Sequence, residues 1–262
     1  MSKSLSTMNS LFANAAGAGI ISQQTSMLLT GSLGNVVVAG AAGKSLEDID
    51  ATDVTLITVL LDASSSIGYS RLQQAVRDGY NALLDAFLTS KERDAILMAL
   101  WIFNDAVKVI HSYVSVADAA VLDRKSYTTS GMTHLYDTWC DALAANIAYA
   151  QRLRDGGTPC RSVVVIITDG ADVGSRRTAR DCAQISRDLL ATEEFVLAFV
   201  GVGKDVDFHA VARSMGVPDG CIAVQAQATP AALRQVFAMV SQSAILVSQA
   251  RIAPGANAGF FN

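Results

Sequence analysis

The strongest constraint on the fold is residues 56–66, which read LITVLLDASSS. The first part of this stretch is apolar or β-branched, and side chains with oxygen atoms follow only at its C-terminal end. A continuous apolar run of this kind predicts a central strand that is buried on both faces of a sheet. Open α/β sheets bind ligands at the carboxyl ends of their strands, so Asp62, Ser64 and Ser66 lie where a ligand site is expected. Three alternating oxygen-bearing side chains in one tight loop could converge on a small hard cation such as Mg²⁺.

Further strand patterns alternate with helical patterns along the chain. Residues 106–114 alternate in polarity and predict a strand antiparallel to the strand before it. Thr229 and Pro230 have the residue types of an N-cap and a first helical position. The alternation predicts an α/β fold, with a doubly wound, mostly parallel central sheet, helices on both faces and one antiparallel edge strand. The other expected strands are residues 94–103, 161–169, 194–202 and 221–225, and the expected helices are residues 69–89, 135–154, 178–190, 206–215 and 229–252.

Composition excludes several classes of protein. The net charge is −4 and the sequence has no basic run, which argues against a nucleic-acid binder. The four cysteines are far apart and form no Cys-x-x-Cys pair, so a structural zinc site is not expected. Free buried thiols are typical of a reducing compartment, and we therefore expect the cytoplasm. No stretch is expected to span a bilayer, and no membrane partner is predicted.

The N-terminal residues 1–51 differ from the rest of the chain. They are rich in Ala, Gly, Ser, Asn and Gln, and carry almost no charge before Lys44. They form either a loosely ordered arm or an assembly arm that pairs with another chain, and NVVVA at residues 35–39 is expected to be a strand. The predicted division is this arm, a domain at residues 52–251 and a tail at residues 252–262. GAAGKS at residues 40–45 is not a phosphate-binding loop, because Val38 stands where the first glycine is required.

Two later segments complete a set of oxygen ligands. Thr133 lies in a glycine-containing loop, SGMTHLYD, and Asp169 ends an apolar strand, IITDG. Together with DASSS at residues 62–66, these segments resemble the metal-ion-dependent adhesion site of von Willebrand factor A domains, and the resemblance covers roughly residues 53–249. Met132 departs from the family pattern, in which a glycine is frequent before the threonine, and it could narrow access to the metal or cover it.

The resemblance implies a role for each residue. The hydroxyls of Ser64, Ser66 and Thr133 would ligate a divalent cation, and Asp62 and Asp169 would act through bound water or, for one of them, directly. The implied metal is Mg²⁺, with Mn²⁺ and Ca²⁺ as alternatives. Each residue also has an ordinary structural alternative: the aspartates as turn residues, and the hydroxyls as helix caps. The structural alternatives would require all five residues to occur in the family's order by coincidence, so the metal site is favoured.

Neighbouring polar residues receive lesser roles. His134 is expected to face solvent or to cap the following helix, because imidazole suits softer metals than Mg²⁺. Asp172 could support the outer shell of the site, and Asp105 is expected to be a plain turn residue. Tyr136 and Asp137 are expected to anchor the threonine loop to its helix.

The resemblance favours a binding module over an enzyme. The chain resembles small intracellular bacterial proteins of the MoxR-associated and tellurite-resistance types. This resemblance implies an adaptor or assembly factor whose metal binds a carboxylate of a protein partner. A MoxR-type AAA+ ATPase is one such partner. The first alternative is a self-assembling structural protein. It would form a homo-oligomer through the arm, the Phe260-Phe261 tail and the metal site. A magnesium-dependent phosphoryl-transfer or hydrolytic enzyme is disfavoured, since the sequence has no Asp-x-Asp pair, GxSxG turn or phosphate loop. No catalytic residue is predicted.

Overall fold

The computed structural model describes residues 2–261 and is built on a six-stranded sheet with the order β3-β2-β1-β4-β5-β6. All neighbouring strands are parallel except β2 and β3, which are antiparallel. The central strand β1 is buried along its whole length, as its apolar sequence predicts. The predicted sheet and its antiparallel edge strand are confirmed. The strands are β1 (Val54–Asp62), β2 (Ile96–Phe103), β3 (Val107–Ser115), β4 (Cys160–Thr168), β5 (Phe195–Val202) and β6 (Ile222–Gln225).

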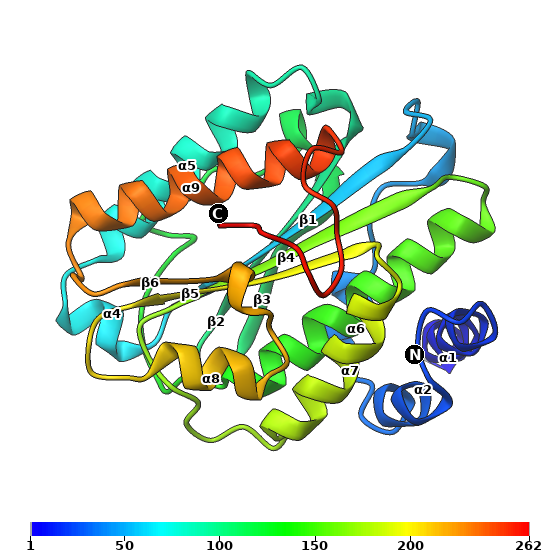
Figure 1. Cartoon of the computed structure of the whole chain (residues 1–262), viewed down its shortest axis with the longest axis horizontal. Helices are drawn as coiled ribbons and strands as arrows, with labels where there is room; N and C mark the ends of the chain where they lie inside the picture. The colour runs from blue at the N-terminus through cyan, green and yellow to red at the C-terminus, as the bar shows by residue number, and fades with distance from the viewer. Residues whose placement is uncertain (1, 262) are drawn as a thin grey trace.

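Helices cover both faces of the sheet (Figure 1). Helices α5 (Gln73–Leu88) and α9 (Pro230–Ser248) lie together on one face, and α6 (Leu135–Asp155), α7 (Ala179–Ala191) and α8 (Phe208–Ser214) lie on the other. Helix α5 buries Val76, Tyr80, Leu83 and Phe87, whose spacing of three to four residues forms one apolar stripe. The arrangement is the predicted doubly wound fold.

Two predicted helices have different limits. The helix expected at residues 69–89 is α5 and begins only at Gln73; a separate short helix, α4 (Ser65–Tyr69), precedes it, and Arg71, with a φ of 55°, interrupts the helical backbone between them. The final helix ends at Ser248 rather than at residue 252, and Ala250 beyond it has a φ of 55°. Its predicted start is confirmed: Thr229 accepts a hydrogen bond from the amide of Ala232, and Pro230 is the first helical residue.

The N-terminal residues form three helices, α1 (Ser2–Gly17), α2 (Gln23–Thr30) and α3 (Asn35–Gly40). Helix α1 packs against α6 and buries Met8, Phe12 and Ala15 (Figure 1). The expectation of a strand at residues 35–39 is wrong. A Cβ on Gly40 would lie 2.0 Å from the ring of Trp101, so the backbone of α3 approaches the body of the fold closely, and this packing overrides the β propensity of the valines.

Both ends of the chain pack onto the domain. After α3, the amide of Lys44 donates to the carbonyl of Tyr113 over 3.0 Å, so this segment lies along the edge strand β3. Near the C-terminus, Phe260 is fully buried and the amide of Phe261 donates to the carbonyl of Gly220. Large apolar side chains of the arm and of the tail, such as Phe12 and Phe260, are therefore buried within the chain.

Helix α9 is the one helix of the described chain that is long and apolar enough to cross a bilayer by length and composition. The expectation that no stretch meets this measure is therefore wrong. Half of its most apolar stretch is buried inside the fold, and it packs against α5 and the sheet. This packing is the arrangement of a core helix.

Candidate metal centre

The site lies at the carboxyl ends of two neighbouring parallel strands. Asp62 is the last residue of β1, and Asp169 directly follows β4. The register pairs Leu61 with Ile167, so the two strand ends stop side by side. The chain then turns from β1 into α4, which places Ser64 and Ser66 over the same edge of the sheet.

Hydrogen bonds connect four of the five predicted ligands. The amide of Ser64 donates to Oδ1 of Asp62 over 2.7 Å, and the Oγ atoms of Ser64 and Ser66 are 2.9 Å apart. The hydroxyl of Ser66 donates to Oδ1 of Asp169 over 2.6 Å. Thr133 lies beside them, since a Cβ added to Gly170 would be 3.3 Å from its Oγ1. The structure thus brings together all five residues.

The serine and threonine hydroxyls of the site do not act as helix caps, the structural alternative to metal ligands. Ser64 occupies the N-cap position of α4, but its side chain makes no capping hydrogen bond and contacts Ser66 instead. Thr133 is not the N-cap of α6, because His134 holds that position. The two serine side chains thus contact each other, and Ser66 contacts Asp169, rather than capping a helix end.

The donor set fits a small hard cation. Its side-chain donors are all carboxylate or hydroxyl oxygens, which Mg²⁺ prefers. In an octahedral shell of radius about 2.1 Å, adjacent ligands lie about 3 Å apart, and the two serine oxygens are already 2.9 Å apart. Nowhere in residues 2–261 do three or more His, Cys, Asp or Glu residues form a group that could hold a metal ion. The hydroxyl-rich cluster is therefore the candidate cation site.

Burial makes the carboxylates of the site costly to ionise. Burial raises the pKa of Asp62 to about 6; hydrogen bonds from Thr168 and Ser64 oppose this rise, and the nearby charge of Asp169 adds to it. Burial also raises the pKa of Asp169, and the hydrogen bond from Ser66 opposes that rise. Two partly desolvated acids at one strand edge would be stabilised as anions by a bound divalent cation.

Three residues that support the site were missed at the sequence level. The hydroxyl of Thr168 donates to Oδ2 of Asp62 over 2.5 Å, and that of Tyr127 donates to the Asp62 carbonyl over 2.5 Å. The backbone carbonyl of Asn104 accepts a hydrogen bond from the His134 amide, and its side-chain Nδ2 donates to the carbonyl of Ser130, so Asn104 braces the threonine loop. Thr168 could have been found as a polar residue at the end of a buried strand, whereas Tyr127 carries no such signal.

The neighbouring polar residues have mixed outcomes. Asp137 accepts hydrogen bonds from the amides of Arg176 and Arg177, so it anchors the loop after β4 to α6 rather than the threonine loop that was expected. Asp172 accepts from the amide of Tyr136 over 3.1 Å, so its Oδ1 holds the start of α6 rather than facing the ligand cluster.

The structure confirms Asp105 as a turn residue and places His134 at the N-cap position of α6, one of its two expected places. His134 is at the N-cap position, but its side chain makes no capping hydrogen bond and its Nε2 is buried without a hydrogen-bond partner. The loop at Gly174 closes over the ring, since a Cβ there would be 2.8 Å from this Nε2. Asp105 is exposed in the turn between β2 and β3, as expected, and a Cβ on Gly131, whose φ is 71°, would lie 2.2 Å from its Oδ1.

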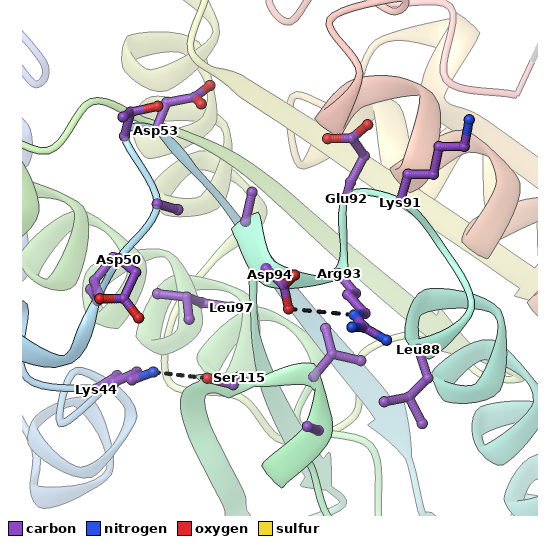
Figure 2. Close-up of a pocket in the computed structure, with 16 residues that line it drawn as sticks. Lys44, Asp50, Asp53, Leu88, Lys91, Glu92, Arg93, Asp94, Leu97 and Ser115 are labelled. Atoms are coloured by element: carbon purple, nitrogen blue, oxygen red, sulfur yellow. Dashed lines mark hydrogen bonds and ion pairs between the residues drawn. The ribbon is translucent and has the colours of Figure 1, made fainter.

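A separate hollow of about 740 Å³ lies at the opposite, amino ends of β1 and β2 (Figure 2). Charged side chains of both signs surround it. The Nζ of Lys44 donates to Oγ of Ser115, and Arg93 pairs with its neighbour Asp94 over 3.4 Å. None of the five predicted ligands lines this hollow, so it is distinct from the candidate metal centre.

Comparisons with known proteins agree with this arrangement. The family model described as "von Willebrand factor type A domain" matches residues 57–238. A search of curated proteins finds no match.

Solved structures share the fold at low sequence identity. Proximal thread matrix protein 1 from the mussel byssus is 20% identical, with a TM-score of 0.53 over 74% of this chain and 46% of its own. Another structure of that protein is described as having a zinc-occupied MIDAS motif, the metal-ion-dependent adhesion site. The D319A mutant of the PilB minor pilin from Streptococcus sanguinis is 11% identical, with a TM-score of 0.55 over 78% of this chain and 64% of its own. The chain thus spans about half the length of the byssus protein.

Proposed function

Because this chain belongs to the von Willebrand factor type A domain family, we propose that it is a metal-dependent protein–protein interaction module. The hydroxyls of Ser64, Ser66 and Thr133 would hold a divalent cation, with Asp62 and Asp169 acting through water or, for one of them, directly. The observation that carries this proposal is the chain of contacts from Asp62 through both serines to Asp169. Its oxygen-only donor set favours Mg²⁺, with Mn²⁺ and Ca²⁺ as alternatives.

The protein's own residues prepare the site. Thr168 and the Ser64 amide each hold one carboxylate oxygen of Asp62, which fixes the orientation of that side chain. The DASSS turn carries its two serine hydroxyls at a separation suited to adjacent ligands. A bound cation would supply one exchangeable coordination position, which a carboxylate from another protein can fill. Neutral hydroxyl ligands leave the cation's charge incompletely neutralised and thereby favour this anionic partner.

We propose that the biological role is that of an adaptor or assembly factor, and that it acts in the cytoplasm. A MoxR-type AAA+ ATPase is the class of partner that the sequence resemblance suggests. Support for a divalent cation comes from the byssus matrix protein, which has been described with zinc in the corresponding motif.

Two other functions are weaker candidates. The matrix and pilin relatives are consistent with a self-assembling structural protein, but the arm and the Phe260-Phe261 tail pack within their own chain. Phosphoryl transfer or hydrolysis is disfavoured because the sequence has no recognisable nucleophile or phosphate-binding loop. We therefore propose no catalytic residue.

Calorimetric titration with Mg²⁺ tests the metal site. Wild-type protein should bind the cation, whereas Asp62→Ala and Ser66→Ala should lose at least most of this affinity. Ser70→Ala is a matched control, because Ser70 is an exposed serine at the end of the same short helix. Circular dichroism verifies that each variant is folded. Equal Mg²⁺ binding by wild type and Ser66→Ala would contradict the proposed site.

A further inference from the structure

We infer that the metal centre is the middle of a docking surface for a protein segment in which an acidic side chain is flanked by bulky apolar side chains. Tyr69, Met132 and Val173 supply the apolar part of this surface, which we call the apolar rim. The inference rests on the proposed function and names the chemistry of the partner.

The rim residues are placed next to the ligands by three separate elements. Tyr69 lies on α4 three residues after Ser66, a spacing that puts two side chains on the same side of a helix. Met132 directly precedes Thr133. The amide of Val173 donates to the carbonyl of Thr133 over 2.8 Å, which places the loop after β4 beside the same residue.

Two of these elements also meet each other. A Cβ on Gly174 would lie 3.5 Å from Cε of Met132, so the loop that carries Val173 runs against the Met132 side chain. The two loops and α4 thus carry large apolar side chains next to residues of the proposed metal site. This placement puts the rim beside the proposed metal contact.

The rim is unusual in its exposure. The exposed fractions are 86% for Tyr69, 48% for Met132 and 51% for Val173. Only six large hydrophobic side chains of the described chain are exposed, and these three are half of them. Isolated exposed apolar residues need no explanation, but a group gathered around a polar site indicates a binding surface.

A physical reason connects the rim with the carboxylate contact. An ion pair in open water is weak, because the high dielectric constant screens it and water competes for the same groups. Apolar contacts around such a pair exclude water, as do the contacts that surround interface hot spots. A partner that brings only an acid would leave the rim in water, so apolar neighbours of the acid complete the interface.

The rim also selects the type of segment. Its side chains come from three separate segments: α4, the loop before α6 and the loop after β4. Apolar groups on both sides of the partner's acid can therefore contact the rim. In an extended segment, residues next to the acid and two positions away lie within about 7 Å of it. A linear peptide is therefore a sufficient probe.

The test uses the full chain and an array of synthetic peptides. Each peptide keeps a central aspartate, and the positions on either side are varied. In Mg²⁺, we expect peptides with Phe, Leu, Ile or Met beside the aspartate to bind at least tenfold more tightly than those with Ser. Binding should disappear in EDTA and when the aspartate is replaced by asparagine.

Variants then assign the preference to the rim. Tyr69→Ser and Met132→Ser should each weaken the best peptide about tenfold, the scale of losing a well-packed interface side chain, and should leave Mg²⁺ affinity by calorimetry unchanged. Met27→Ser is the matched control: Met27 is 67% exposed on α2, far from α4 in the fold (Figure 1). It should leave both affinities unchanged.

The outcomes separate this inference from the proposed function. If the protein binds Mg²⁺ and binds peptides through their aspartate, but with equal affinity whatever the flanking residues, the inference is overturned and the proposed function stands. Peptide binding that persists in EDTA, or no binding to any peptide in the array, would also overturn it. Absence of Mg²⁺ binding in calorimetry would instead remove the proposed function and, with it, the inference.

Discussion

Replacing Asp62 by asparagine should stabilise the metal-free protein at neutral pH. The carboxylate is 2% exposed and receives the Ser64 amide on Oδ1 and the Thr168 hydroxyl on Oδ2. In Asp62→Asn, the side-chain oxygen can still accept from Ser64, and the new amide can donate to Oγ1 of Thr168. The Thr168 hydroxyl is then free to donate to the carbonyl of Gly170, which is 3.2 Å away. The substitution therefore removes a charge and retains the hydrogen-bond network.

The magnitude follows from the raised pKa of Asp62. Burial moves this pKa from 3.8 to about 6, so the folded chain binds a proton more tightly than the unfolded chain. The stability that this group contributes is complete below pH 3.8 and is lost as the pH rises through 6. At 1.36 kcal/mol per pKa unit, the loss at pH 7.5 is at most about 3 kcal/mol. Asp62→Asn should recover about 1 to 3 kcal/mol at pH 7.5 and about a third of that at pH 4.5.

Urea unfolding in EDTA at both pH values measures this effect. A second series with Mg²⁺ at one thousand times its Kd should reverse the order, because that concentration stabilises a binding-competent chain by about 4.1 kcal/mol. The variant should gain much less from the metal. The reasoning is refuted if Asp62→Asn is less stable than wild type in EDTA at pH 7.5, or if its effect is the same at both pH values.

Three further substitutions test the support of the site and the packing of the fold. Thr168→Val keeps the side-chain shape but removes the hydroxyl that holds Asp62, so calorimetry should show about tenfold weaker Mg²⁺ binding; unchanged affinity would exclude this supporting role. Gly79→Ala should lower the free energy of unfolding by about 1 to 3 kcal/mol, because the new Cβ would lie 2.1 Å from the ring of Phe237; an unchanged urea midpoint would contradict this packing of α5 on α9. Phe12→Ala should cost about 3 to 5 kcal/mol, because Phe12 is fully buried where α1 packs on α6. If limited proteolysis instead releases α1 with the urea midpoint unchanged, α1 is a separate folding unit.

The sheet and the site could be predicted because they depend on local patterns. Long apolar runs identified β1, β2, β4 and β5, and the polar residues at their ends gave the position of the cluster. Parallel strands stop at the same edge of a sheet, so Asp62 and Asp169 could be placed together without knowing any contact. The hydroxyl ligands followed from the spacing of DASSS and from the resemblance of three segments to one family.

The parts that were not predicted depend on distant packing. The valine run at residues 35–39 has strand propensity, but it forms the helix α3, whose backbone at Gly40 lies against Trp101. Tyr127 reaches the carbonyl of Asp62 from a loop 65 residues away, and no periodicity records this contact. His134 was expected in solvent or as a helix cap; it holds the N-cap position, but the loop at Gly174 lies against its buried Nε2.

The cost of the buried carboxylates is itself an argument for a ligand. An apolar side chain at the end of β1 would avoid the desolvation that raises the pKa of Asp62, and core strands elsewhere in this sheet are almost wholly apolar. The chain instead places Asp62 and Asp169 together, where their negative charges oppose each other. Local violations of good packing are expected at functional sites, where a bound ligand offsets them. A divalent cation would remove both penalties at once, and the exposed apolar rim beside it would remain in water until a partner covers it.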